Sequence, residues 1–178
     1  MSQALQALYE GDVARARELL PPDPELTIFE AAAFGRTDRL REILTAEASQ
    51  VTALSIDGFT ALHLAIFGNQ REAAGVLIDH GADVNQLSTG TIAQVPPLGT
   101  AAFVGSLPLA RLLLDAGADV NGDEGSGFTA LHAAAENGDP DIARELLARG
   151  ADRRIRTSEG KTAADLAAND DLRRLLST

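Results

Sequence analysis

Two histidines, His63 and His132, stand in nearly the same sequence context in different parts of the chain. The segments that contain them read DGFTALHLAIFGN and SGFTALHAAAENG. Histidine is a common general base and metal ligand, so an identical pair first raises catalysis or metal binding. The third histidine, His80, follows an expected helix end, where a cation suits the helix dipole. No nucleophile motif and no metal-ligand spacing accompanies the three, so we expect no catalytic residue, no bound metal and no cofactor.

One acidic segment, DVNGDEG, is similar to the start of a calcium-binding loop. Such a loop needs glycine at its sixth position and an acidic residue at its twelfth. These positions hold Glu124 and Ala130. We therefore interpret the segment 119–125 as a turn, in which glycines supply the backbone freedom.

Basic residues gather in one segment, RGADRRIR, residues 149–156. The segment could bind a phosphate or an acidic partner, or it could be a solvated edge that offsets neighbouring acidic residues. We favour the solvated edge. The net charge of −11 argues against a nucleic-acid partner, because phosphate binding needs clusters of Lys and Arg.

Composition limits the remaining possibilities. The 178 residues include no cysteine, which excludes disulfides and thiolate metal sites. No basic leader precedes an apolar run, and no apolar run approaches the length of a membrane span. We therefore expect a cytoplasmic chain without membrane contact. The preference for Arg over Lys and the richness in Ala suggest a bacterial source.

Three sequence features recur at a nearly constant spacing. The turn GADVN begins at Gly81 and Gly117, and GADRR begins at Gly150. A Thr-Ala-Leu-His segment begins at Thr60 and Thr129. Leucines that end expected helices recur at Leu19, Leu44, Leu77, Leu113 and Leu146. The spacing predicts stacked supersecondary units, because a fixed period within the range of known repeat lengths is typical of repeat proteins.

Within one unit the residue types predict two short helices. Thr60 and Thr129 can cap the first helix, which is rich in alanine. A glycine-containing turn leads to the second helix, for example 140–149 with Asp139 as its N-cap. The glycines that follow the second helices are expected to have positive φ. Because one unit cannot bury its apolar face alone, successive units must stack.

These motifs resemble the ankyrin-repeat family, whose unit matches this period and carries a Thr-Pro-Leu-His-type motif. The resemblance rests mainly on residues 57–85 and 126–154 and extends over nearly the whole chain. It implies an all-α ankyrin-repeat solenoid of stacked helix-turn-helix units linked by short β-hairpin-like loops. We expect a single domain, 1–178, with units near 2–20, 24–54, 55–87, 88–123, 124–156 and 157–178. The first and last units are atypical caps.

Two units depart from the family motif. The segment VPPLGTAAFVGS has Pro96 and Gly99 where Thr and His are expected, and ELTIFEAAAFGRTDRLREIL lacks the Thr-x-x-His pair. In the family this histidine helps to join adjacent loops through hydrogen bonds. The resemblance therefore implies that His63 and His132 are structural, as are Thr60, Thr129, Gly81, Gly117 and Gly150.

Aromatic residues share one position of the first helix in four consecutive units. They are Tyr9, Phe34, Phe67 and Phe103, and Glu136 follows in the fifth unit. In the family this position lies on or beside the concave face, so the resemblance implies a binding strip. The rings could instead pack against one another and stiffen that face, and both interpretations stay open. Phe59 and Phe128, each after a hairpin glycine, would extend the apolar surface to the hairpin tips.

The link between the third and fourth units is three residues longer than the others. It reads QLSTGTIAQVPP, residues 86–97. A long irregular loop on a rigid scaffold is a usual place for recognition, although lengthening a surface loop costs little. The candidate contact residues in this loop are Leu87, Thr91, Ile92 and Gln94.

The sequence predicts a non-catalytic protein-interaction scaffold that is a monomer by itself. Its partner, another protein of unknown identity, would bind the concave face and the hairpin tips. The alternative is a receptor for a peptide or a small molecule in the concave groove. An enzyme of an unrecognised type is disfavoured, because the three histidines are dispersed and no cysteine is present.

Overall fold

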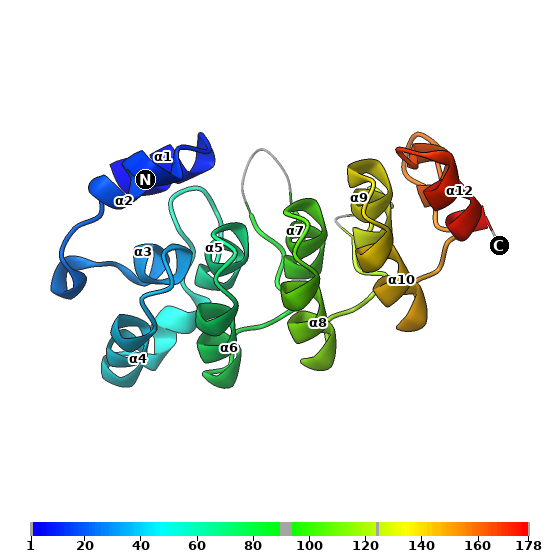
Figure 1. The fold of residues 1–178 in the computed structure, drawn as a ribbon. Helices are drawn as coiled ribbons and strands as arrows, with labels where there is room; N and C mark the ends of the chain where they lie inside the picture. The colour runs from blue at the N-terminus through cyan, green and yellow to red at the C-terminus, as the bar shows by residue number, and fades with distance from the viewer. Residues whose placement is uncertain (1, 90–93, 124, 178) are drawn as a thin grey trace. The chain divides into compact units, whose positions relative to one another are not determined.

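A computed structural model describes residues 2–89, 94–123 and 125–177 of the chain. In this part the chain folds into short α-helices that follow one another in pairs (Figure 1). The chain divides into two compact units, each larger than a single repeat. The first unit has residues 1–83 and 88–92, and the second unit has residues 84–87 and 93–178. From here on, "unit" means one of these two, and a single helix pair with its link is called a repeat. The all-α prediction is confirmed, while the single domain and the exact repeat boundaries stay predictions.

The first unit contains three helix pairs. They are α1 (Gln3–Tyr9) with α2 (Val13–Glu18), α3 (Ile28–Ala33) with α4 (Thr37–Ala46), and α5 (Ala61–Phe67) with α6 (Arg71–Asp79). Two 3-10 turns, η1 (Asp23–Glu25) and η2 (Ala48–Thr52), flank the middle pair. We call the first helix of each pair the inner helix and the second the outer helix. Inner helix α3 packs against α5, and outer helix α4 packs against α6.

The second unit repeats this arrangement. Its pairs are α7 (Pro97–Phe103) with α8 (Leu107–Asp115), α9 (Ala130–Asn137) with α10 (Pro140–Ala148), and α11 (Ala163–Leu166) with α12 (Asp170–Ser177). Inner helix α9 packs against both α7 and α11, and outer helix α10 packs against α8. The predicted N-cap is confirmed for α10, because the Asp139 side chain accepts hydrogen bonds from the amides of Asp141 and Ile142.

Tight turns connect the helix pairs. Leu54 and Thr60 form an isolated antiparallel bridge, and no longer strand occurs among the described residues. The Ser55 amide donates to the Phe59 carbonyl at 2.8 Å and closes a hairpin-like link, as predicted. The glycines after the outer helices, Gly81, Gly117 and Gly150, have the expected positive φ of 90–94°.

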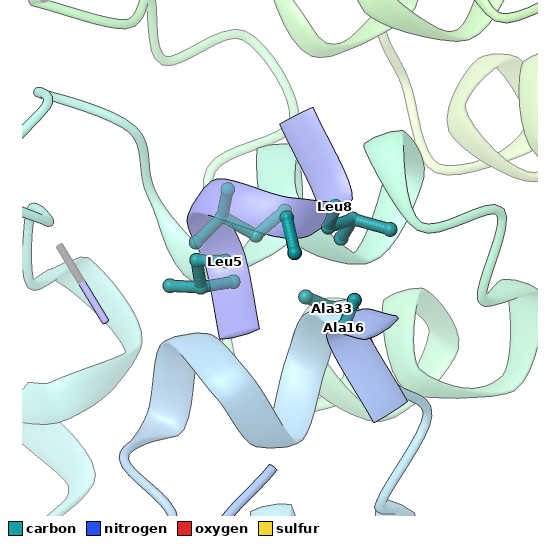
Figure 2. Close-up of a cluster of buried hydrophobic side chains, with 6 residues drawn as sticks. Leu5, Leu8, Ala16 and Ala33 are labelled. Atoms are coloured by element: carbon teal, nitrogen blue, oxygen red, sulfur yellow. The ribbon is translucent and has the colours of Figure 1, made fainter. Parts of the chain in front are cut away.

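Each unit buries a core of leucine and alanine side chains. In the first unit α1, α2, α3 and α5 supply one cluster, formed by Leu5, Ala7, Leu8, Ala16, Ala33 and Leu64. Figure 2 shows Leu5 and Leu8 of α1 gathered with Ala16 and Ala33. Small residues on α2 and α3 let the backbones come close to α1, so the first helix pair is anchored despite its short length. None of the helices in the described residues has the length and apolar character needed to cross a bilayer.

Introducing a charge at a buried position of the second unit tests the packing of the outer helices. Leu113 of α8 has no exposed surface. We expect Leu113→Asp to lower the free energy of unfolding by at least about 3 kcal/mol, because the carboxylate would be buried without a partner. Chemical denaturation followed by circular dichroism measures this loss.

The matched control is Arg144→Asp on α10. Arg144 is exposed and its ion pair with Asp141 is a surface pair at 2.9 Å. This control should cost less than about 1 kcal/mol. Equal stability of wild type and Leu113→Asp would show that the packing of α8 is not as described.

Candidate interaction surface

The two candidate catalytic histidines close the N-termini of inner helices. In α5 the His63 amide donates to Thr60 Oγ1 at 3.3 Å, and this hydroxyl lies 2.8 Å from Nδ1 of the same histidine. In α9 the Thr129 amide donates to Nδ1 of His132 at 3.2 Å. Both histidines are about 1% exposed. Each ring is therefore engaged by its own helix terminus, which supports the structural interpretation.

Two further inner helices, α3 and α11, use the same cap with a carboxylate in place of the imidazole. The Glu30 carboxylate accepts from the Thr27 amide at 3.0 Å and from its hydroxyl at 2.8 Å. The Asp165 carboxylate accepts from the Thr162 amide at 2.8 Å, and this bond lowers the pKa of Asp165. The Thr-x-x-His pattern missed these caps, although a search for any acceptor three residues after Thr would have found them. Helix α7 has no such side-chain cap and begins with Pro97 instead.

His132 lies in a buried environment that disfavours its charged form. Burial lowers the pKa of His132, and the backbones of Lys161 and Ile155 in the following link act in the opposite direction. The buried Nε2 atom makes no hydrogen bond of normal geometry within the described part of the chain. The burial of the ring and the direction of this shift both favour its neutral form.

Asparagines at the end of the GADVN motif join successive turns of the second unit. Asn85 Oδ1 accepts from the Asp119 amide at 2.8 Å, and Asn85 Nδ2 donates to the Gly117 carbonyl at 3.3 Å. Asn121 makes the same two bonds one repeat later, at 2.8 and 3.4 Å. In the sequence, the signal for these bonds is the asparagine that ends the GADVN motif. These side chains link repeats, so their recurrence reflects the scaffold rather than a binding site.

The acidic segment is a turn, as predicted. The Asp123 carboxylate accepts from the amides of Gly125 and Gly127, and the Asp119 carboxylate accepts from the Asn121 amide at 2.9 Å. These bonds use the carboxylate oxygens within the turn itself. Across the ranges that the structure describes, no group of three or more acidic, histidine or cysteine side chains could hold a metal ion. Glu124, at the sixth loop position, lies outside those ranges.

Two arginines of the basic segment, Arg149 and Arg154, pair with acidic residues of the same unit. Arg149 donates to Asp115 at 2.7 Å and to Glu145 at 3.0 Å. Arg154 donates to Asp152 at 3.0 Å, and this bond lowers the pKa of the Asp152 carboxyl. This pairing supports the interpretation of the segment as a solvated edge.

In the first unit, the shared aromatic position of the inner helices holds Tyr9, Phe34 and Phe67, which we call the aromatic row together with Phe103. Tyr9 contacts Phe67 of this row and also Phe59. The rings of Tyr9 and Phe67 meet edge-on with their centroids 5.1 Å apart, and the Tyr9 ring lies 6.2 Å from that of Phe59. Phe34 is also half-buried, and all four rings contact the apolar cluster beneath α1. In the first unit these aromatic rings are therefore partly buried. Phe59 packs against this cluster and is half-buried, and its predicted role at the hairpin stays a prediction.

The Tyr9 hydroxyl is buried without a hydrogen-bond partner among the described residues. Burial raises the pKa of Tyr9 to about 12, and the nearby charge of Asp57 adds to the effect. Tyr9 therefore contributes to the unit through the apolar surface of its ring. Its hydroxyl costs free energy instead.

In the second unit the same position is exposed. Phe103, the last residue of α7, exposes 66% of its surface, and Glu136 of α9 is also exposed. The backbone below the ring is fixed, because Asn137 Nδ2 donates to the carbonyls of Ala102 at 3.0 Å and Phe103 at 2.8 Å. A large exposed ring on an immobilised backbone is typical of a binding anchor.

The predicted residues of the long link and the second hairpin differ in exposure. Leu87 is half-buried and Gln94 is exposed. Thr91 and Ile92 lie outside the residues that the structure describes. Phe128 is half-buried with its ring centroid 5.6 Å from that of His132, so it packs over the helix cap.

The hairpin of the first unit carries an apolar tip that the sequence reasoning missed. Ile56 is 83% exposed and Leu54 is 42% exposed. At the position of Ile56, four residues before the Thr or Pro that precedes the inner helix, two other links have Gly125 and Ser158, and the long link has Ile92. An isoleucine where two repeats need only a small residue was the available signal. A single large apolar residue at a hairpin tip has no packing role, so it belongs with the candidate contacts.

The family assignment follows from this geometry and from sequence comparison. Two family profiles, both described as ankyrin repeats, match residues 3–88 and 113–167. The chain belongs to the ankyrin-repeat family. Members of this family are generally non-catalytic protein-interaction scaffolds, which agrees with capped, buried histidines and with paired basic residues.

Several proteins with ankyrin repeats are similar to this chain. A Caenorhabditis elegans homolog of transient receptor potential cation channel subfamily A member 1 is 32% identical over 149 residues, which are 84% of this chain and 12% of that protein. Human ankyrin repeat and SOCS box protein 6 is 40% identical over 58% of this chain and 26% of its own length. Human protein phosphatase 1 regulatory subunit 27 is 38% identical over 45% of this chain and 55% of its own length.

The chain thus spans less than two thirds of each of these relatives. All three come from animals, so the comparisons give no support to the predicted bacterial source.

Replacing Tyr9 with phenylalanine tests whether the Tyr9 hydroxyl lacks a hydrogen-bond partner. We expect Tyr9→Phe to leave the stability at pH 7 unchanged or to raise it by up to about 1 kcal/mol, because the ring contacts remain. The folded pKa of about 12 exceeds the ordinary value of 10.0, so the unfolded chain loses the proton first. Wild type should therefore lose stability relative to the variant as pH rises from 10 to 12.

Urea denaturation at several alkaline pH values measures this difference. Tyr9 is the chain's one tyrosine, so tyrosinate absorbance reports its titration directly. A clear loss of stability in Tyr9→Phe at pH 7 would mean that the hydroxyl makes a bond that the structure does not show.

Acidification tests the environment of His132. Its folded pKa is lower than the ordinary value of 6.5, so the unfolded chain takes up the proton first as pH falls. The contribution of the neutral ring to the free energy of unfolding is therefore fully present above pH 6.5. It decreases as the pH falls from 6.5 towards the lower pKa of the folded state. His132→Gln should flatten the stability profile between pH 7 and about pH 5, where carboxylates contribute little. Identical slopes for wild type and variant would contradict the assignment.

Proposed function

We propose that this chain is a non-catalytic protein-binding module and that Phe103 is the principal anchor for its partner. The exposure of Phe103 carries the proposal, because the ring could be buried by a partner without any rearrangement of α7. A rigid aromatic anchor gains apolar burial at low cost in conformational entropy. Glu136, exposed on the neighbouring inner helix, would favour a basic group beside the pocket that receives the ring.

The hairpin tip of the first unit is a secondary contact in this proposal. Ile56 is exposed and has no packing role in the unit, so its burial would add to affinity. The long link, with Leu87, Thr91, Ile92 and Gln94, remains a proposed contact as well. By contrast, Tyr9, Phe34 and Phe67 would act indirectly, because their packing stiffens the first unit. The monomeric state and the cytoplasmic location stay predictions.

Site-specific photo-crosslinking tests this surface. A photoreactive phenylalanine analogue at position 103 should crosslink one partner protein from a lysate of the source organism. The matched control places the same analogue at Arg144, which is exposed on outer helix α10 of the same unit. Equal crosslinking from both positions would contradict the proposal.

The captured protein then allows a quantitative measurement. We expect Phe103→Ala to weaken its binding about thirtyfold, which corresponds to a hot-spot residue of about 2 kcal/mol. The melting temperature should stay within about 2 °C of wild type, because an exposed side chain contributes little to folding. Ile56→Ser, which copies the residue of another hairpin, should have a smaller effect. Unchanged affinity of Phe103→Ala would remove Phe103 from the site.

A further inference from the structure

The first unit has a groove on its middle helix pair, lined by none of the residues proposed above as contacts. Its volume is 410 Å³, and its floor contains the buried side chains of Leu26 and Ile28. One wall is a single face of α4, because its residues Arg39, Glu42, Ile43 and Ala46 recur at helical spacing. The remaining lining residues are Thr27, Phe29, Glu47 and Gln50.

The second unit shows what covers the equivalent face of an outer helix. When α4 and α10 are aligned on Leu44 and Leu146, the positions of Ile43 and Glu47 correspond to Glu145 and Arg149. In the second unit, Glu145 accepts a hydrogen bond from Arg111 at 2.7 Å, and Arg149 donates one to Asp115 at 2.7 Å. Arg111 and Asp115 both belong to α8, the preceding outer helix. These positions therefore face an outer helix that packs parallel to α10.

Among the described residues of the first unit, no α-helix other than α3 and α4 lines this groove. The preceding outer helix, α2, has only six residues and packs against α1. The segment PPDP and the turn η1 follow it, and no residue before Leu26 lines the groove. Figure 1 shows α2 beside α1 and well separated from α4. The face that α8 covers on α10 is thus open on α4.

The side chains along the groove define the helix that would fit. Ile43 replaces Glu145, so the incoming helix needs an apolar residue where α8 has Arg111. Glu47 replaces Arg149, so one turn later the incoming helix needs Lys or Arg where α8 has Asp115. Glu47 accepts hydrogen bonds only from neutral donors, Ser49 Oγ at 3.1 Å and Gln50 Nε2 at 3.0 Å, among the residues described. Its negative charge is therefore available to a basic side chain.

The basic residue of the groove is already engaged. Arg39 donates to the Glu42 carboxylate at 3.1 Å and to the Pro24 carbonyl at 3.0 Å. These bonds balance the charge of Glu42 within α4 itself. The groove therefore favours an incoming helix that carries an apolar residue and, one turn later, a basic residue.

We propose that this groove binds an amphipathic helix of a partner protein, which packs on α4 as α8 packs on α10. The helix presents an apolar side chain to Ile43 and, four residues later, Lys or Arg to Glu47. This groove shares no residue with the anchor at Phe103, so either proposal can fail without the other.

Two synthetic peptides provide the probes. The first has the sequence of residues 105–118, which includes α8, with Arg111→Met and Asp115→Lys. The second has the unchanged sequence of residues 105–118. Both carry the same soluble tail and fluorophore, and fluorescence anisotropy measures their binding. We expect wild type to bind the substituted peptide about tenfold more tightly, because it gains an apolar contact and an ion pair.

A charge and polarity exchange on the protein provides the decisive comparison. The double variant Ile43→Glu with Glu47→Arg copies the face of α10, so it should prefer the unchanged peptide. The control Thr45→Lys alters an exposed position of α4 that does not line the groove and should keep the wild-type preference. Circular dichroism confirms that each variant is folded.

Several outcomes would overturn the proposal. They are the absence of saturable binding of the substituted peptide up to about millimolar concentration, and a preference that the double variant does not reverse. Sedimentation of the chain alone provides the last test. If wild type self-associates and the double variant does not, the occupant is a second copy of this chain and the proposed partner helix is wrong.

Discussion

The inner helices of each unit approach one another so closely that only small side chains fit between them. At Gly68, a Cβ atom would lie 2.0 Å from the Ala33 carbonyl oxygen of the preceding inner helix. At Gly127, it would lie 2.1 Å from the Arg156 carbonyl oxygen of the following link. Fully buried alanines, among them Ala32 and Ala65, occupy the rest of these contacts. This approach sets the spacing of successive helices, and the caps, the links and the exposed positions all depend on it.

Several inner helices begin at a threonine whose backbone amide has no partner in the helical ladder, so a local acceptor satisfies it. The chain supplies histidine, glutamate or aspartate three residues later as this acceptor, as in His132, Glu30 and Asp165. The physical requirement is an acceptor at a fixed place, and the chemical type of the side chain is secondary. This explains why a pair of identical histidines, which first raised the question of catalysis, belongs to the scaffold.

The aromatic row illustrates how one sequence position takes two roles. In the first unit α1 brings Tyr9 against Phe67 and Phe59, so these rings are partly buried against one another. In the second unit Glu136 follows Phe103 at this position, and no aromatic contact of Phe103 occurs among the described residues. A rigid unit with one exposed ring is a better binding surface than a mobile one, because less order has to be created on binding. The open face of α4 has a related origin, since a short α2 leaves a contact unfilled.

The sequence by itself determined the all-helical fold, several helix caps such as Thr60 and Asp139, the turn glycines and the family, because each depends on local signals that recur along the repeats. It also placed Tyr9, Phe34, Phe67 and Phe103 in one register, and it excluded the calcium loop. Only the tertiary structure decided which of these residues are exposed, and it revealed Ile56 and the groove on α4. Exposure depends on whether another element lies over a side chain, and a periodic pattern assigns the same position to every repeat whether or not its neighbour covers it.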